Sequence, residues 1–131
     1  MFDEPRQKPG LPPAEIIKRI QKALRHGGDT HTWEDVREGI QDGRLRIFHD
    51  EHGCWIVDLI VTPQKRYLSC WIVAGQLPEV MSLQKEVEKY AEEQGCAFMR
   101  AECRPGWKIV YPQYGWHQTG IVIEKEISHE R

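Results

Sequence analysis

The sequence has no long hydrophobic run, no close pair of cysteines and no large excess of charge of one sign. No apolar stretch approaches the ~20 residues that a helix needs to cross a bilayer. The first 13 residues are polar and hold four prolines, which is unlike a secretory signal peptide. The formal net charge of −2 offers no general attraction for nucleic acid or for an anionic membrane. We therefore expect neither a membrane partner nor a nucleic-acid partner.

The four cysteines are widely spaced, at positions 54, 70, 96 and 103. Each stands within or beside an apolar run of the kind found in strands, which favours small buried thiols in a reducing compartment. We therefore do not expect a secreted protein. Structural zinc sites normally show close ligand pairs, so no metal is expected. A zinc site assembled from these cysteines and some of the six histidines is the alternative.

The length and composition suit one globular domain. A chain of 131 residues is long enough for one core and too short for two ordinary domains. A hydrophobic fraction of 40% and a charged fraction of 29% are ordinary for a folded protein. We predict an extended, proline-rich arm at 1–13 and a single domain at 14–131. Basic residues outnumber acidic ones over positions 1–28, and such a face is either solvated surface or a contact for an anionic partner.

Two amphipathic helices are predicted at the start of the domain. Apolar residues recur at helical spacing after Pro13, and two glycines at 27 and 28 end the first helix. A second helix begins at Thr32 and ends at Gly43. Asp35 follows three residues after Thr32, which is the spacing of a capping box.

The rest of the chain predicts a sheet, and the whole an α+β fold in the order α-α-β-β-β-α-β-α-β. Three successive strands with turns between them predict an antiparallel meander. An amphipathic helix between Pro78 and Gly95 then leads to a fourth strand, and such a crossover implies parallel pairing. A short helical segment at 105–114 precedes the last strand. The strands are expected at 44–49, 54–62, 67–74, 96–103 and 121–127.

The segment RPGWKIVYPQYGW carries the most motif-like pattern. N-acetyltransferases of the GNAT type often show an Asn, a small residue three positions on, an apolar residue followed by Tyr, and a Gly-aromatic pair four residues after that Tyr. Here Val110-Tyr111 and Gly115-Trp116 stand at the matching spacing, with Trp107 in the position of the small residue. Together with the predicted element order, this segment resembles the GNAT family.

The resemblance extends over roughly residues 14–127 and is sharpest for one group. Thr32-Trp33 at the second helix and Arg-Pro-Gly-Trp followed by Tyr-Gly-Trp are similar to small GNAT-like proteins of tailed phages and prophages, encoded near head and portal genes. The resemblance implies the GNAT fold. It also implies a phage or prophage setting for the protein.

The turn after the third strand departs from the GNAT pattern. In active members a Gln/Arg-x-x-Gly-x-Gly/Ala turn and the following helix N-terminus hold the pyrophosphate of acetyl-CoA, because unpaired N–H groups and the helix dipole attract anions. The resemblance places Val73, Gly75 and Gln76 at that site. Only one glycine is present, Pro78 has no N–H to donate, and Glu79 puts a carboxylate in the phosphate's field. The turn suits a helix start better than a pyrophosphate site.

Four further residues are candidates for the site that the resemblance implies. Tyr111 matches the tyrosine that protonates the leaving thiolate, a role that suits a phenol with a pKa of about 10; the alternative is a packed tyrosine with a bonded hydroxyl. Arg104 replaces the family's coenzyme-contacting Asn. Asp58, in an apolar strand, and Glu102 are candidate general bases. Either one could instead form an ion pair, Glu102 with Arg100.

Two functions follow from these residues. The first is a catalytically degenerate GNAT-like protein of phage or prophage origin that acts as a virion-associated or head-assembly component. It would need no cofactor, would contact other phage structural proteins or itself, and would reside in the host cytoplasm or the virion. The alternative is an active N-acetyltransferase that binds acetyl-CoA through an atypical loop. The five tryptophans are either core residues or contacts with a partner.

Overall fold

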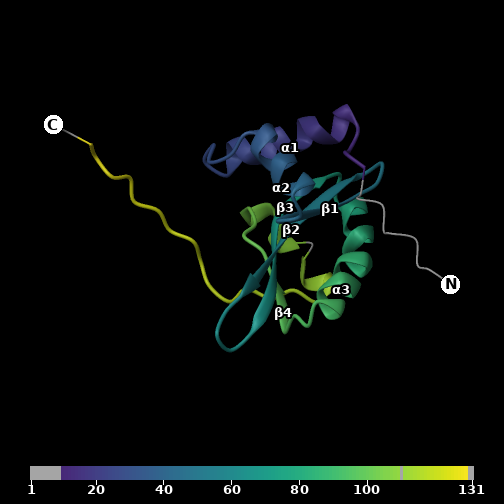
Figure 1. Cartoon of the computed structure of the whole chain (residues 1–131). Helices are drawn as coiled ribbons and strands as arrows, with labels where there is room; N and C mark the ends of the chain where they lie inside the picture. Colours follow the sequence, from purple (N-terminus) through teal and green to yellow (C-terminus); the bar gives the residue numbers. More distant parts are fainter. Residues whose placement is uncertain (1–9, 110, 130–131) are drawn as a thin grey trace. The chain divides into compact units, whose positions relative to one another are not determined.

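The computed structural model describes residues 10–109 and 111–129. The chain divides into two compact units, which meet in the sequence between Ala101 and Glu102. The first unit contains the two leading helices, a sheet and a third helix (Figure 1). Most of the predicted arm at 1–13 lies outside the described residues. No helix among the described residues is both long enough and apolar enough to cross a membrane.

The helix α1 (Ala14–His26) forms because its apolar residues share one face. Ile16, Ile20 and Leu24 are buried along that face, at the spacing that a helix of 3.6 residues per turn brings into line. Pro13 stands at the N-cap, where its missing N–H costs nothing, and Gly27 is the C-cap. The predicted helix is therefore confirmed.

The helix α2 (Trp33–Gln41) begins with the predicted capping box. The Asp35 N–H donates to the Thr32 hydroxyl oxygen at 3.2 Å. In return, the Thr32 N–H donates to the Asp35 carboxylate at 2.8 Å. Two backbone donors that a helix start leaves without partners are thus satisfied by side chains.

We expect Thr32→Ala to lower the free energy of unfolding by about 1 kcal/mol, because alanine cannot accept the Asp35 N–H. Chemical denaturation followed by far-UV circular dichroism measures this loss. Thr119→Ala is the matched control, since Thr119 is exposed in a segment without regular structure, and a change within about 0.5 kcal/mol is expected. Equal stabilities for the two variants would contradict the importance of the cap.

The sheet has the predicted order and directions. Its strands are β1 (Leu45–His49), β2 (Gly53–Val61), β3 (Arg66–Gly75) and β4 (Phe98–Arg100), in spatial order β1-β2-β3-β4. The first three form an antiparallel meander, and β4 is parallel to β3. Between β3 and β4 run the 3-10 helix η1 (Glu79–Leu83) and the helix α3 (Gln84–Glu93). The strand–helix–strand crossover and its parallel pairing are thus confirmed, although β4 is shorter than the expected 96–103.

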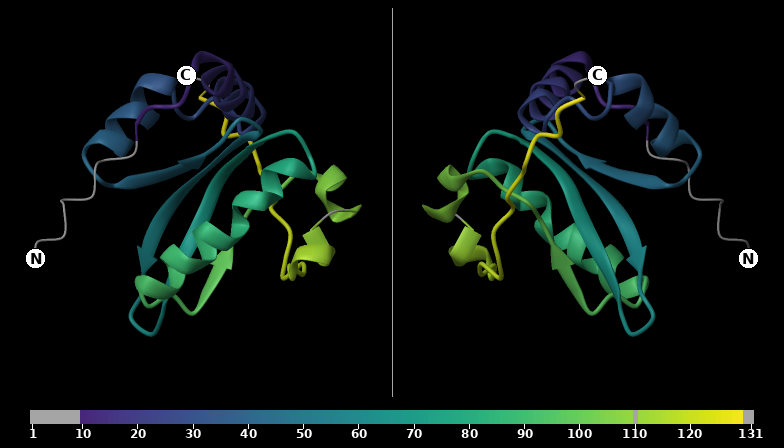
Figure 2. Two further views of the ribbon diagram at one scale, coloured as in Figure 1. Left: turned by 90° about the vertical axis from the view of Figure 1, so that its right-hand side faces the viewer. Right: turned by 90° about the vertical axis from the view of Figure 1, so that its left-hand side faces the viewer.

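The helices cover opposite faces of the sheet (Figure 2). On one face, α1 and α2 form a core with alternate residues of the strands, including Ile47, Ile56 and Ile72. On the other face, the Trp55 indole N–H donates to the Val80 carbonyl at 2.9 Å. The edge of the Phe48 ring meets Tyr90 of α3 on this same side, with ring centroids 5.7 Å apart. Both faces of the sheet are therefore covered by helices near the start of β2 and the end of β3.

A β-bulge interrupts the pairing of β2 with β3. Ile56 pairs with Ile72, but the next residue, Val57, pairs with Cys70. Trp71 is thus an extra residue in β3, and the side-chain alternation of that strand reverses at this position. As a result, Ser69 and Trp71 both face the side of the sheet that carries α1 and α2, and Ser69 lies opposite Asp58.

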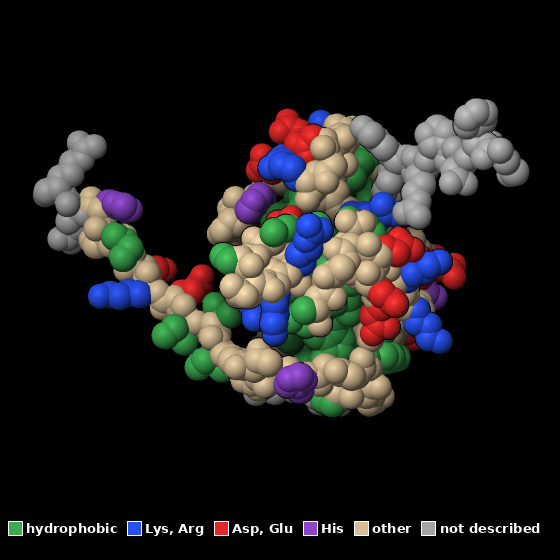
Figure 3. All heavy atoms as spheres, turned by 60° about the horizontal axis from the view of Figure 1, so that its bottom comes forward, with side chains coloured by type: hydrophobic (Ala, Val, Ile, Leu, Met, Phe, Trp, Pro, Cys, Tyr) green, Lys and Arg blue, Asp and Glu red, His purple; other side chains and the backbone are tan. Residues whose placement is uncertain are grey.

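The second unit has less regular structure than predicted. The helical segment at 105–114 appears as two 3-10 helices, η2 (Pro105–Ile109) and η3 (Tyr111–Tyr114). The final strand predicted at 121–127 is wrong. These residues form neither helix nor strand, because no neighbouring strand among the described residues supplies ladder hydrogen bonds to them. Figure 3 shows apolar side chains exposed along this C-terminal segment.

The cysteines are free thiols. Cys54 and Cys70 are buried, and burial raises the pKa of each to about 12, which leaves them protonated and unreactive near neutral pH. The expectation of four buried thiols is wrong for Cys103, which is exposed, and Cys96 is only half-buried, since both cysteines lie outside β4. Over the described part of the chain, no group of His, Cys, Asp and Glu could hold a metal ion.

Candidate functional site

The turn that follows β3 is the position at which a coenzyme pyrophosphate would be expected. Three of its backbone N–H groups donate to carbonyl groups of the chain itself. The Gln76 N–H donates to the His52 carbonyl at 2.9 Å, the Val80 N–H to the Gln76 carbonyl at 2.8 Å, and the Met81 N–H to the Pro78 carbonyl at 2.9 Å. Pro78 has no N–H. Four of the backbone nitrogens that could face an anion here are therefore unable to donate to one.

Gly75 is required in this turn by the neighbouring strand. A Cβ atom built at Gly75 would collide with the His52 carbonyl oxygen and would lie 2.8 Å from the Cα of Gly53. Gly53 and Gly75 are paired residues of β2 and β3, and their backbones approach so closely that no side chain fits between them. This packing explains the glycine without any ligand. Val73, which the resemblance also places at the coenzyme site, is half-buried in β3.

The helix that follows the turn starts irregularly. Five residues of 3-10 helix precede α3, with Glu79 in the first turn and no side-chain cap at Pro78. The indole hydrogen bond from Trp55 to Val80 ties this start to β2. A carboxylate in the first turn complements the positive end of the helix and repels a second anion. The sequence prediction of a helix start that is poorly suited to phosphate therefore agrees with the local geometry.

A groove of about 770 Å³ lies beside α2, on the sheet face that α1 and α2 cover. The bulge in β3 contributes to it by turning Ser69 and Trp71 to this side. The edge of the His31 ring meets Trp71, with centroids 4.6 Å apart. The residues that line the groove come from the α1–α2 loop, α2 and β1–β3: His31, Asp35, Glu38, Gly43, Arg44, Leu45, Asp58, Leu59, Ser69 and Trp71.

Asp58 is the predicted site residue that the structure places in this groove. Burial raises its pKa, and the charge of Arg44 and a backbone hydrogen bond from Leu59 oppose that rise. Arg44 forms its ion pair with Asp42, with 2.8 Å between Nε and Oδ2. An acid whose pKa is raised by partial burial, in a groove with a neighbouring hydroxyl, has the properties of a candidate general base.

The remaining predicted residues belong to the second unit. Glu102 and Arg104 are exposed, and Tyr111 is half-buried. The Tyr111 carbonyl accepts the Trp116 N–H at 3.2 Å, so the Tyr-Gly-Trp segment closes as a local turn. Arg100 of the first unit lies over the ring of Tyr67, 4.7 Å from its centroid. The roles of Tyr111 as the acid, Glu102 as a base and Arg104 as a coenzyme contact stay predictions.

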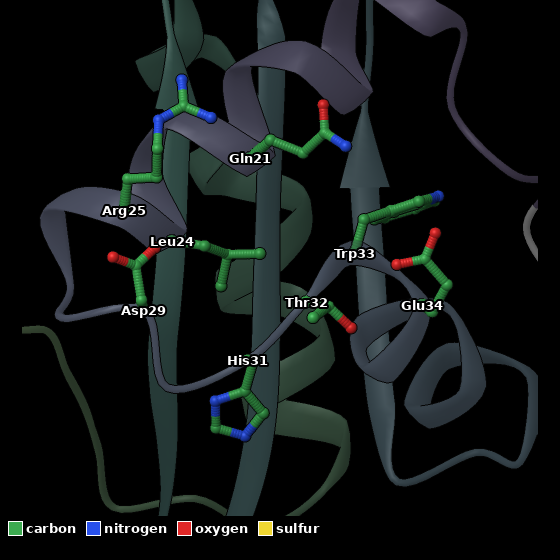
Figure 4. A pocket seen from close by; sticks show the side chains of 8 residues that line it. All are labelled: Gln21, Leu24, Arg25, Asp29, His31, Thr32, Trp33 and Glu34. Carbon is green, nitrogen blue, oxygen red and sulfur yellow. The ribbon is translucent and has the colours of Figure 1, made fainter.

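A second, shallower depression of about 360 Å³ lies between the end of α1 and the start of α2 (Figure 4). Arg25 of the basic first helix lines it, as do the acidic residues Asp29 and Glu34. Positive and negative side chains share this surface, so it offers no concentrated charge to an anionic partner. The interpretation of the first helix as solvated surface is therefore the better supported one at this end of α1.

The structure is similar overall to several solved structures, some of which are acetyltransferases. A tetramutant of the BH1408 protein from Bacillus halodurans is similar over 87% of this chain and 91% of its own, with a TM-score of 0.64 at 11% identity. Glucosamine-6-phosphate N-acetyltransferase from Arabidopsis thaliana matches over 86% and 94%, with a TM-score of 0.61 at 14% identity. A putative acetyl transferase from Pyrococcus furiosus matches over 87% and 95%, with a TM-score of 0.56 at 16% identity.

The fold is that of the GNAT acetyltransferases. No protein-family model matches the sequence, and no curated protein is significantly similar to it. At identities of 11–16% the likeness establishes the GNAT fold and leaves the activity to the residues themselves. The expected fold class is thereby confirmed.

Sequence reasoning missed most of the groove. His31, Ser69 and Trp71 line it, but the bulge that turns two of them to one side depends on pairing between strands and has no local signature. The single usable signal was Asp58, a carboxylate in the middle of an apolar strand. Asp58 is one of the residues that line the groove.

Proposed function

We propose that this GNAT-fold protein has a degenerate coenzyme site and acts as a structural component of a phage or prophage, in the virion or in head assembly. The observation that supports the loss of the coenzyme site is the closed turn after β3, where the donors of Gln76, Val80 and Met81 are bonded to the chain's own carbonyls. The resemblance of Thr32-Trp33 and the Tyr-Gly-Trp segment to phage proteins supports the phage or prophage origin.

The free-energy balance favours the turn without a bound pyrophosphate. A pyrophosphate would have to replace existing backbone hydrogen bonds, each of which contributes about 0.5–1.5 kcal/mol net, so the exchange gains little. The Glu79 carboxylate, in the first turn of η1, repels the incoming anion. A GNAT enzyme depends on this anion contact to hold its acyl donor, and a chain without it is better suited to a binding role.

A second candidate function is supported by Asp58. Its raised pKa and its place in a groove next to Ser69 are the properties that an amine-activating base requires. In that case the protein would be an acetyl-CoA-dependent N-acetyltransferase that binds the coenzyme mainly through contacts other than the pyrophosphate turn, with Tyr111 as the acid.

Titration with acetyl-CoA by isothermal calorimetry separates the two functions. We expect no saturable heat up to millimolar coenzyme, because the turn offers few free donors. The Arabidopsis glucosamine-6-phosphate N-acetyltransferase is the positive control in the same buffer. Saturable binding at micromolar acetyl-CoA that weakens in Tyr111→Phe would refute the degenerate site and favour the enzyme.

The structural role has its own test. Particles and assembly intermediates purified from the source phage or induced prophage should contain the protein when their proteins are identified by mass spectrometry. Its absence from both would refute the structural role, whatever the calorimetry shows. The two experiments therefore test the two parts of the proposal separately.

A further inference from the structure

The groove beside α2 carries more negative than positive charge. Three carboxylates line it, those of Asp35, Glu38 and Asp58. Among the described residues that line the groove, Arg44 supplies the one guanidinium, and this guanidinium is paired with Asp42, which does not line the groove. Every lining residue belongs to the first compact unit. The excess negative charge is therefore a property of that unit alone.

Asp58 is a half-buried carboxylate that forms no ion pair within the part of the chain that the structure describes. Burial raises its pKa, and the charge of Arg44 opposes this rise only in part. The Arg44 Nε instead donates to Asp42, at 2.8 Å. Removing a carboxylate from water without a counter-ion is unfavourable. A cation that enters the groove from outside would therefore stabilise Asp58.

The lining of the groove suits a guanidinium group in particular. The hydrogen bond and the charge of Asp42 raise the pKa of Arg44, and the charges of Glu38 and Asp58 add to that rise. Two carboxylates from different elements, α2 and β2, thus act on one guanidinium at the same time. Trp71 is half-buried and also lines the groove. A planar guanidinium can bridge two carboxylates through its fixed donors and can stack on an aromatic ring.

We propose that this groove docks an arginine side chain of a partner protein, held by Asp58 and Glu38 beside Trp71. A volume of about 770 Å³ is far larger than one side chain, so the partner's flanking main chain also has room. Charge complementarity between the acidic groove and a basic segment favours this occupant. The proposal rests on the structural role proposed above for the kind of partner, and it is independent of whether coenzyme A binds.

A peptide titration tests the docking. The probe is acetyl-Gly-Gly-Arg-Gly-Gly-amide, added to the isotopically labelled native chain at low ionic strength, and NMR follows the backbone amides of Asp58 and Trp71. We expect saturable shifts at both residues. The same peptide with citrulline in place of arginine keeps the shape and loses the charge, so it should bind at least about tenfold more weakly. Equal binding of the two peptides, or no saturable shift, would overturn the proposal.

Variants of the lining residues assign the contact. Asp58→Asn should weaken binding of the arginine peptide at least about tenfold, because the neutral amide cannot pair with a cation. Arg44→Gln should tighten binding by up to about fivefold, since it removes a competing positive charge. Glu86→Gln is the matched control, at an exposed position of α3, and should leave binding unchanged. Circular dichroism verifies that each variant is folded. An Asp58→Asn variant that binds as tightly as the native chain would contradict the assignment.

Two further measurements distinguish other sources of the cation. Methylguanidine carries the same charged group without a main chain, and binding as tight as that of the peptide would assign the groove to a small molecule instead. Arg104→Gln and Lys125→Gln remove exposed basic side chains of the second unit. Tighter peptide binding in either variant would show that the chain supplies its own cation, and would overturn docking of a partner.

The docking and the structural role fail separately. Absence of the protein from particles and assembly intermediates would refute the structural role, and the peptide result would stand. A failed peptide titration would refute the docking groove, and the result from the particles would stand.

Discussion

Replacing Trp55 with alanine should lower the free energy of unfolding by about 3–5 kcal/mol. Trp55 is 1% exposed, and truncation removes a large buried ring and leaves a cavity between β2 and η1. It also leaves the Val80 carbonyl without the indole donor at 2.9 Å. Since a small domain is stable by only about 5–15 kcal/mol, this variant should lose a large fraction of its stability. Urea denaturation followed by circular dichroism measures the change.

Trp55→Phe separates the two contributions. Phenylalanine retains most of the apolar area but cannot donate to Val80, so this variant should lose about 1–3 kcal/mol, the cost of an unsatisfied buried carbonyl. A Trp55→Ala loss below about 1 kcal/mol would show that this side of the sheet is not a packed core.

Gly75→Ala should lower the free energy of unfolding by about 3 kcal/mol, the upper part of the range for overpacking. The added Cβ would meet the His52 carbonyl and the Gly53 Cα, which are backbone atoms of β2 and cannot rotate away. Relief requires the two strands to separate at the point where the Gln76 N–H bonds to His52. Thermal unfolding and chemical denaturation should both record the loss.

Gly120→Ala is the matched control for Gly75→Ala. Nothing lies within 4 Å of a Cβ built at Gly120, so its effect should stay within about 0.5 kcal/mol. If Gly75→Ala were as stable as this control, the close strand contact would not be the reason for the glycine, and a ligand-binding role would regain support.

The features that could be predicted from the sequence are those encoded by neighbouring residues. The Thr32–Asp35 capping box and the buried stripe of α1 both depend on contacts within four residues, which is the range that helical spacing specifies. The hairpin connections and the crossover likewise follow from short turns and handedness. The α+β order up to β4 was accordingly predicted correctly.

The features that could not be predicted depend on pairing between distant residues. The segment 121–127 has strand composition, but a strand needs a neighbour, and a sequence pattern does not say whether one is available. The bulge at Trp71 depends on how β2 and β3 align, and the groove around Asp58 depends on the bulge. The sequence identified Asp58 as unusual and could not identify its surroundings.

At the bulge at Trp71, alternate residues of β3 change from one face of the sheet to the other, although the burial pattern of the strand does not reveal this change. Leu68, Cys70, Ile72 and Ala74 alternate without interruption and are all buried, as if they formed the inner face of one ordinary amphipathic strand. The extra residue divides them: Ile72 and Ala74 pack under α1 and α2, and Leu68 and Cys70 point to the side of α3. Deleting Trp71 would place Cys70 directly before Ile72, opposite Val57 and Ile56 in regular pairing, so every other residue of β3 would keep its face of the sheet. The deletion should therefore remove the bulge and one side chain of the groove and leave both cores in register.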